Sequence, residues 1–246
     1  MKAFFDIFRK HAEADQSYRQ TFEIEGAPGM VVLDAFHQIQ ENLDPSFAYR
    51  YSCRGAICGS CAVRINGTAM LACKTQVQGL AEKGTIVVDP LGNLPPIKDL
   101  VVENAAFWAE YAKTMPYLAR KEDQHDQSFT WSDKMSVQQL DQFDRCLDCI
   151  KCAACFSDCP KRAQDTAFIG PAACVQVYRY YFDPRDADHP RRVDFSKSPG
   201  GVVACDSFGN CVKVCPKDVR PLRAINFIKQ DLGVPLKAKS RPARSE

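Results

Sequence analysis

The feature that most constrains this chain is the grouping of its 13 cysteines along 246 residues. Most of them stand in three short runs, in which successive cysteines are separated by two to five other residues. An odd number of cysteines cannot pair completely in internal disulfides, and closely spaced rows of thiols suit a metal site better. The N-terminal segment MKAFFDIFRKHAEADQ lacks the apolar core of a signal peptide. We therefore expect a reducing compartment and metal ligands rather than a secreted disulfide scaffold.

The first run, CRGAICGSC, has the spacing C-x4-C-x2-C, and a fourth cysteine follows in TAMLAC. This is the plant-type [2Fe–2S] ferredoxin spacing. A binuclear cluster needs two thiolates on each iron, and Gly55 and Gly59 would let the loop backbone approach the sulfurs. A structural zinc site is the alternative, but its ligands usually form two separated C-x2–4-C pairs. The predicted [2Fe–2S] ligands are Cys53, Cys58, Cys61 and Cys73.

The second and third runs follow the C-x2-C-x2-C-x3-C-P pattern of bacterial ferredoxins. CLDCIKCAACFSDCP contains it in full, whereas CDSFGNCVKVCP has Phe208 in place of its second cysteine. In two-cluster ferredoxins the fourth cysteine of each run ligates the other cluster. This rule predicts a [4Fe–4S] cluster on Cys149, Cys152, Cys155 and Cys215. Since a corner without a thiolate tends to lose its iron, it also predicts a [3Fe–4S] cluster on Cys159, Cys205 and Cys211.

Two cysteines remain outside these sets. Cys146 and Cys174 are predicted to be small buried hydrophobic side chains. Cys146 as a ligand is the alternative, but the position of Pro160 after the last cysteine argues against that register. The four histidines lie outside the motifs, so a Rieske centre with histidine ligands is not expected.

The pattern of apolar residues predicts an α+β protein with two domains. Residues 1–100 are predicted to form a plant-type ferredoxin-like (β-grasp) domain. Its expected elements are strands at 3–9, 19–25 and 84–90, a helix at 31–43 and a hairpin at 61–73 that turns at Asn66-Gly67.

A connector rich in Pro, Gly and Asn, DPLGNLPPIKDL, precedes a change of composition. Residues 101–232 are predicted to form an all-helical, bacterial-ferredoxin-like domain that carries the second and third runs. The basic segment 233–246 is predicted to be a disordered tail. Expected helices cover residues 100–120, 136–149, 168–182 and 221–232. Ser136 is the expected N-cap of the second, and the Gly170-Pro171 pair suits the start of the third.

Several classes of function are disfavoured by the rest of the sequence. A net charge of +2 gives no electrostatic case for a nucleic-acid partner, and no apolar run approaches the length of a membrane span. No G-x-G-x-x-G, G-x-S-x-G or P-loop motif is present. Three clusters then form an electron-transfer wire, and chemistry on an organic substrate is expected on a flavin or similar cofactor in another subunit.

The motifs CRGAICGSC…LAC, PLGNLPPIKDLVV, CLDCIKCAACFSDCP, FIGPAACVQVYRYYFDPRD and CDSFGNCVKVCPKDVRPLRAIN occur in that order. From about residue 20 to 232 the chain resembles the iron–sulfur subunit of succinate dehydrogenase and fumarate reductase. The resemblance implies a flavoprotein subunit with covalent FAD, and a membrane anchor with a quinone and often haem b. It implies electron transfer between FAD and quinone through the [2Fe–2S], [4Fe–4S] and [3Fe–4S] clusters. It also implies a peripheral location on the cytoplasmic side of the membrane, and it leaves the direction of the reaction open.

The resemblance further places the quinone against the [3Fe–4S] end, close to Pro160. Several ubiquinone-reducing relatives have a tryptophan and a histidine where this chain has Gln164 and Asp206, a departure that favours menaquinone. Lys229 stands where some fumarate reductases have a lysine facing the quinone, and a solvated lysine is the alternative. The quinone-site candidates are Pro160, Gln164, Asp206 and Lys229.

Two other functions are compatible with a chain that carries three clusters. One is a wire subunit of another flavin-linked oxidoreductase, such as a thiol-linked fumarate reductase, whose iron–sulfur subunit often carries repeated CCG motifs that this sequence lacks. The other is a soluble multi-cluster ferredoxin with no fixed partner. The near-neutral charge and the additional helices argue against it, because small carriers are often strongly acidic.

Overall fold

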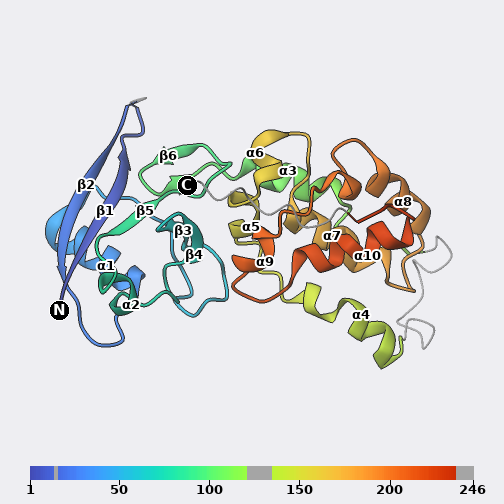
Figure 1. The fold of residues 1–246 in the computed structure, drawn as a ribbon, viewed down its shortest axis with the longest axis horizontal. Coiled ribbons are helices and arrows are strands. Elements are labelled where there is room, and N and C mark those ends of the chain that lie inside the picture. Colours follow the sequence, from blue (N-terminus) through green and yellow to red (C-terminus); the bar gives the residue numbers. More distant parts are fainter. Residues whose placement is uncertain (14–15, 121–134, 237–246) are drawn as a thin grey trace. The chain divides into compact units, whose positions relative to one another are not determined.

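The computed structural model describes residues 1–13, 16–120 and 135–236. The chain forms two compact units (Figure 1). Unit 1 comprises Met1–Ala106 and Ile150–Asp158, and unit 2 comprises Phe107–Cys149 and Cys159–Glu246. A short piece of the second cysteine run thus belongs to the N-terminal unit. Most of the predicted disordered tail, residues 237–246, lies outside the described residues.

Unit 1 is built on a mixed five-stranded sheet with the strand order β2-β1-β5-β3-β4. The β1 and β5 strands are parallel, and the other neighbouring strands are antiparallel. Burial alternates along β1, where Phe5 and Ile7 are fully buried, as a strand with one face in the core requires. The arrangement confirms the predicted ferredoxin-like domain. The strands are β1 (Lys2–Lys10), β2 (Ser17–Glu25), β3 (Ala62–Ile65), β4 (Thr68–Leu71) and β5 (Ile86–Asp89).

Two local predictions in unit 1 are confirmed. The helix expected at 31–43 is α1 (Val32–Gln38), which continues into a π-helical turn at Ile39–Leu43. The hairpin turn at Asn66 and Gly67 has φ angles of 48° and 78°. Two positive φ values are typical of the type I′ turn, whose twist matches that of the flanking strands.

A buried arginine ties the sheet of unit 1 to two loops. The guanidinium of Arg9 is 1% exposed, and it bonds Asp99 at 3.0 Å and Asp44 at 2.7 Å. Hydrogen bonds from Ser46 and Arg9 lower the pKa of Asp44 to about 2. Because each charge has a partner, the buried ion cluster is satisfied and fixes both loops on β1.

The region from 96 to 120 differs from the prediction. The expected connector contains β6 (Pro96–Lys98), which pairs with β7 (Val101–Val102). The helix expected at 100–120 is shorter than predicted: α3 spans only Ala105–Lys113. The β-branched pair Val101–Val102 favours a strand, and Pro116 limits a helix on the other side.

Unit 2 is helical, which confirms the predicted class of the second half. The longest helices pack around α7 (Pro171–Tyr181), most of whose residues are buried, and α10 (Pro221–Asp231) lies along it (Figure 1). Gly170 with a φ of 87° and Pro171 begin α7, while Ser136 caps α4 and accepts from the Gln139 backbone N–H, as predicted. The helices after α3 are α4 (Val137–Leu147), α6 (Pro160–Gln164), α7 (Pro171–Tyr181), α8 (His189–Lys197), α9 (Asn210–Lys213) and α10 (Pro221–Asp231). Unit 1 also holds the short helices α2 (Gln78–Ala81) and α5 (Ala154–Ser157).

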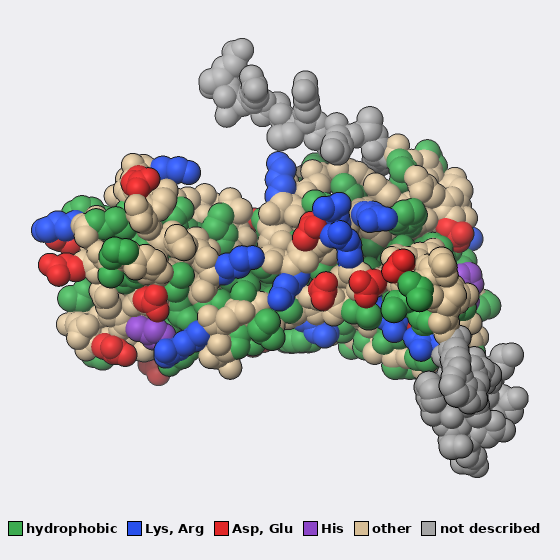
Figure 2. All heavy atoms as spheres, turned by 90° about the horizontal axis from the view of Figure 1, so that it is seen from below, with side chains coloured by type: hydrophobic (Ala, Val, Ile, Leu, Met, Phe, Trp, Pro, Cys, Tyr) green, Lys and Arg blue, Asp and Glu red, His purple; other side chains and the backbone are tan. Residues whose placement is uncertain are grey.

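The surface and the helix lengths agree with the bulk composition. On the face shown in Figure 2, basic and acidic side chains are interspersed, in keeping with a net charge of +2. Within the described ranges, every helix falls short of the length and apolar character needed to cross a membrane.

Candidate metal centres

The first cysteine loop turns its backbone N–H groups toward a thiol. Cys53 Sγ accepts from the backbone N–H of Gly55 at 3.4 Å, Ile57 at 3.3 Å and Cys58 at 3.2 Å. The left-handed φ values of Arg54 (54°) and Gly59 (75°) let the loop curl in this way. These hydrogen bonds lower the pKa of the Cys53 thiol to about 6. The loop therefore favours a thiolate, the form that binds iron.

The other two predicted [2Fe–2S] ligands meet at the open end of the hairpin. Cys61 precedes β3 and Cys73 follows β4, and the backbone N–H of Ala72 donates to the Cys61 carbonyl at 3.1 Å. Burial raises the pKa of Cys61 to about 12, and Cys73 interacts with it directly. Cys58 also contributes to that shift. The four thiols thus form an exposed pair and a buried pair, and two pairs of thiolates fit a binuclear cluster.

A segment of the second run packs against this first loop within unit 1. A Cβ on Gly59 would lie 2.7 Å from the Cβ of Cys152 and 3.2 Å from the Ile150 carbonyl oxygen. Only glycine allows this approach, because any larger residue would overlap the backbone of the neighbouring segment. The ligand loop of one predicted cluster therefore contacts a ligand of the next.

Polar contacts hold the segment 150–158 in unit 1. The Gly92 N–H donates to Ser157 Oγ at 2.8 Å, and the Asn93 amide donates to the Phe156 carbonyl at 2.8 Å. The Ala69 N–H on β4 donates to the Asp158 carboxylate at 2.9 Å. These bonds fix Cys152 and Cys155 relative to the [2Fe–2S] loop.

The four predicted [4Fe–4S] ligands do not all lie in one unit. Cys152 and Cys155 belong to unit 1, and Cys149 and Cys215 belong to unit 2. The thiol of Cys215 accepts from the Val219 N–H at 3.4 Å. Lys151 and Ala153 have φ values of 54° and 61°, so the chain curls tightly around Cys152. The set as a whole stays a prediction.

The three predicted [3Fe–4S] ligands gather inside unit 2. Cys159 stands before α6, Cys205 follows a 3₁₀ turn at Val202–Ala204, and Cys211 lies in α9. All three are buried, at 8%, 9% and 6% exposure. Burial raises the pKa of Cys211 to about 12, and Cys205 and Cys159 add to the shift. Thiols buried so closely together are expected to release their protons only to a metal.

Phe208, at the vacant position of the third run, is half-buried and stands between Cys205 and Cys211 in the sequence. Gly209 beside it has a φ of 85°, which brings the chain into α9. The backbone N–H of Ser207 donates to Cys205 Sγ at 3.4 Å. The loop thus offers two thiols and one apolar ring, and Cys159 supplies the third thiol, which fits a cluster with three ligands.

The quinone-site candidates occupy different environments. Pro160 is the first residue of α6, and Gln164 is exposed at its end. Asp206 lies 3.6 Å from the Lys161 ammonium. Lys229 is 2% exposed and donates to the Cys205 carbonyl at 2.5 Å, so the solvated alternative for this lysine is wrong. The sequence signal for this contact is the place of Lys229 one turn after Ile225, on the buried face of α10.

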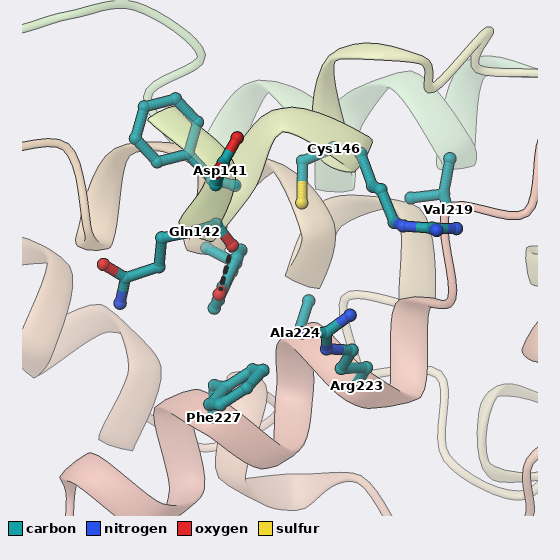
Figure 3. Close-up of a pocket in the computed structure, with 10 residues that line it drawn as sticks. Asp141, Gln142, Cys146, Val219, Arg223, Ala224 and Phe227 are labelled. Atoms are coloured by element: carbon teal, nitrogen blue, oxygen red, sulfur yellow. Dashed lines mark hydrogen bonds between the residues drawn. The ribbon is translucent and has the colours of Figure 1, made fainter. Parts of the chain in front are cut away.

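The two remaining cysteines are buried, as predicted. Cys174 is fully buried in α7, and burial raises its pKa well above the usual value. Cys146 is 8% exposed and lines a small cavity of about 50 Å³ between α4 and α10. Figure 3 shows its thiol pointing toward Ala224 and Arg223 of α10. Both thiols behave as small apolar side chains in helix contacts.

Within the described residues, no group of three or more His, Cys, Asp or Glu side chains is arranged to hold one metal ion. The class of cofactor is indicated by comparisons with known proteins. Residues 4–109 match the family described as "2Fe-2S iron-sulfur cluster binding domain". This match confirms the predicted [2Fe–2S] domain.

Two solved structures share the fold. A chain of the "Mycobacterium smegmatis Sdh1 complex in the apo form" superposes with a TM-score of 0.81 at 23% identity, over 96% of this chain and 99% of that one. A hypothetical protein from Helicobacter pylori gives a TM-score of 0.56 at 17% identity, over 94% of this chain and 39% of that one.

Curated relatives share both sequence and length with the chain. The succinate dehydrogenase iron-sulfur subunit of Coxiella burnetii is 35% identical over 93% of this chain and 96% of its own length. That of Paracoccus denitrificans is 34% identical over 92% and 86%. The fumarate reductase iron-sulfur subunit of Haemophilus influenzae is 33% identical over 90% and 89%. The chain therefore belongs to the family of succinate dehydrogenase and fumarate reductase iron–sulfur subunits, as its ordered cysteine motifs predicted.

Proposed function

We propose that this chain relays single electrons between FAD in a flavoprotein subunit and a quinone in a membrane anchor. The reaction of the whole complex is succinate oxidation by quinone or its reverse, fumarate reduction by quinol. The three iron–sulfur clusters supply the one-electron chemistry when bound. This chain itself carries no chemistry on the organic substrate, and it sits peripherally at the cytoplasmic face of the membrane.

The observation that carries the proposal is the contact of Gly59 with Cys152. It supports an order in which the [2Fe–2S] site precedes the [4Fe–4S] site, because a ligand of the second lies against the loop of the first. We assign Cys53 and Cys58 to one iron of the binuclear cluster, and Cys61 and Cys73 to the other. The assignment follows the exposed and buried pairs seen in unit 1.

We assign the quinone end to the Cys159, Cys205 and Cys211 site, with Pro160 and Lys229 beside it. The buried ammonium of Lys229, bonded to the Cys205 carbonyl, adds positive charge next to a cluster that gains an electron. Gln164 and Asp206 stand where ubiquinone-reducing relatives have tryptophan and histidine, so we propose menaquinone as the partner. Extraction of the quinone from the purified complex tests this point, and ubiquinone alone would contradict it.

Purification of the native complex through a tag on this chain tests the electron-relay function. We expect co-purification of covalent flavin and of a membrane subunit, with succinate-dependent reduction of a quinone analogue. The same preparation tests the alternative of a soluble ferredoxin. A free carrier would elute near 27.5 kDa in gel filtration without flavin, and that result would overturn the proposal.

A further inference from the structure

The loop between Cys205 and Cys211 encloses a hydroxyl group that lacks a partner. Ser207 is 5% exposed, and its Oγ makes no hydrogen bond within the part of the chain that the structure describes. Its φ of 64° lies in the left-handed region, which serine adopts only rarely. An unpaired buried hydroxyl destabilises the fold, because it loses its hydrogen bonds to water without replacement. The combination of burial and backbone strain indicates that the hydroxyl has an acceptor in the assembled protein.

The neighbouring polar groups of this loop already have partners. The Cys205 carbonyl accepts from Lys229 at 2.5 Å, and the Asp206 carboxylate lies 3.6 Å from Lys161. The Ser207 backbone N–H donates to Cys205 Sγ at 3.4 Å, so the residue is folded over a ligand sulfur. The Cys205 sulfur beside Ser207 is a weak acceptor as a neutral thiol and becomes a stronger one as a cluster ligand.

We infer that the Ser207 hydroxyl donates a hydrogen bond to a sulfur of the cluster held by Cys159, Cys205 and Cys211, and so raises its reduction potential. The inference rests on the proposed [3Fe–4S] assignment at this site. One-electron reduction adds negative charge to the cluster, and a donor aimed at its sulfur stabilises the reduced state more than the oxidised state. Ser207 would thus tune the reduction potential through this hydrogen bond, without ligating iron.

The test compares wild-type complex with Ser207→Ala and Ser207→Gly in a redox titration followed by EPR. Both variants are expected to keep the signal of the oxidised [3Fe–4S] cluster. In both, the equilibrium constant for its reduction should fall roughly tenfold, which is 59 mV for a one-electron couple. Glycine relieves the strain of a positive φ whereas alanine does not. An equal shift in the two variants thus reports the hydroxyl, and a shift in the glycine variant alone overturns the inference.

Pulsed EPR in D₂O provides a readout of the hydrogen bond itself. The wild-type cluster should couple to deuterons of the Ser207 O–H and of the backbone N–H groups that donate to the ligand sulfurs, and Ser207→Ala should lose the O–H coupling alone. Ser196→Ala is the matched control. Ser196 is fully buried too, but its Oγ donates to the Arg192 carbonyl at 2.8 Å in unit 2. Its loss should leave the potential and the couplings unchanged.

The possible outcomes distinguish failure of the Ser207 inference from failure of the [3Fe–4S] assignment on which it rests. A wild-type [3Fe–4S] signal whose potential and couplings are unaltered in both Ser207 variants overturns the role of Ser207 alone. A wild-type complex without a [3Fe–4S] signal overturns the cluster assignment and the inference with it. If neither variant assembles, the wild-type spectrum decides, and the absence of any exchangeable coupling beyond those of the backbone N–H groups at the ligand sulfurs overturns the inference.

Discussion

Gly59 lies directly against Cys152, with room for a hydrogen atom but not for a Cβ between them. The first residue belongs to the loop that wraps the [2Fe–2S] site, and the second is a predicted ligand of the [4Fe–4S] site. A side chain at position 59 would separate the two ligand segments or displace one of them.

Gly59→Ala is therefore expected to damage both sites. Alanine would meet the Cys152 Cβ at 2.7 Å, and it would also be strained at a φ of 75°. We expect a loss of stability of more than about 3 kcal/mol, from strain and overpacking together. EPR should show reduced occupancy of the [2Fe–2S] and [4Fe–4S] clusters.

Gly67→Ala is the matched control, since Gly67 has a φ of 78° but nothing lies within 4 Å of the position that a Cβ would take there. It should lose about 1–2 kcal/mol from strain alone and keep both clusters. Equal damage in the two variants would contradict the importance of the Cys152 contact.

Phe208→Cys should supply a fourth thiol to the cluster at the quinone end. We expect partial conversion of [3Fe–4S] to [4Fe–4S], a lower reduction potential and slower electron exchange with quinone. Phe208→Leu keeps the site apolar and should keep the [3Fe–4S] signal. EPR spectra of Phe208→Cys identical to those of the wild type would mean that position 208 does not face the vacant corner.

Lys229→Met should lower the potential of the same cluster. The change removes a buried positive charge and leaves the Cys205 carbonyl without its donor. We expect the reduction equilibrium constant to fall by roughly tenfold, about 59 mV. The exposed Lys213 on α9 provides the control, and Lys213→Met should have no effect. A raised KM for quinone with an unshifted potential would instead assign Lys229 to quinone binding.

Cys215→Ser should abolish the [4Fe–4S] signal and spare the [3Fe–4S] signal, although Cys215 lies in the same run as Cys205 and Cys211. Cys146→Ser is the control, because its thiol faces the small cavity beside α10 (Figure 3). That variant should retain the iron and sulfide content of the wild type. Loss of the [3Fe–4S] signal in Cys215→Ser would refute the crossed assignment.

The Asp183 carboxylate should make stability dependent on pH in the acid range. Although burial raises its pKa, hydrogen bonds from Arg185 and Arg179 outweigh this and lower it to about 2. Because the folded pKa is depressed from 3.8, the stabilisation is present above pH 3.8 and is lost as the pH falls toward 2. Its size is on the order of 2 kcal/mol.

Thermal unfolding of the wild type and of Asp183→Asn measures this contribution. The difference in Tm should be constant from pH 8 to pH 5 and should narrow below pH 4. Asp194→Asn, on the exposed side of α8, should show no difference. A Tm difference that increased as the pH fell would contradict the depressed pKa of Asp183.

Much of the fold followed from local signals. The Asn66-Gly67 turn, the Ser136 cap and the Gly170-Pro171 start each combine a side-chain preference with the correct periodicity, and each is observed. Strands β6 and β7 were missed because they have only three and two residues, in a segment rich in proline. The helix α8 was missed because HPRRVDFSK has a weak apolar pattern.

The ligand identities were predictable from spacing, whereas their environment was not. The packing of segment 150–158 against the rest of unit 1 depends on hydrogen bonds such as that from Gly92 to Ser157, which are 65 residues apart in the sequence. The contact of Lys229 with Cys205 likewise joins residues 24 apart. The place of Lys229 on the buried face of α10 indicates its burial, but a single sequence does not identify the partner in such a non-local contact. These contacts set the burial and charge around each thiol.

The central claim is that this chain holds three different clusters, the last with only three protein ligands. EPR of the intact complex, titrated against electrochemical potential, tests it most directly. We predict signals of [2Fe–2S], [4Fe–4S] and [3Fe–4S] clusters, with the [3Fe–4S] signal present in the oxidised complex and titrating at a higher potential than the [4Fe–4S] signal. A second [4Fe–4S] signal in place of [3Fe–4S] would contradict the account.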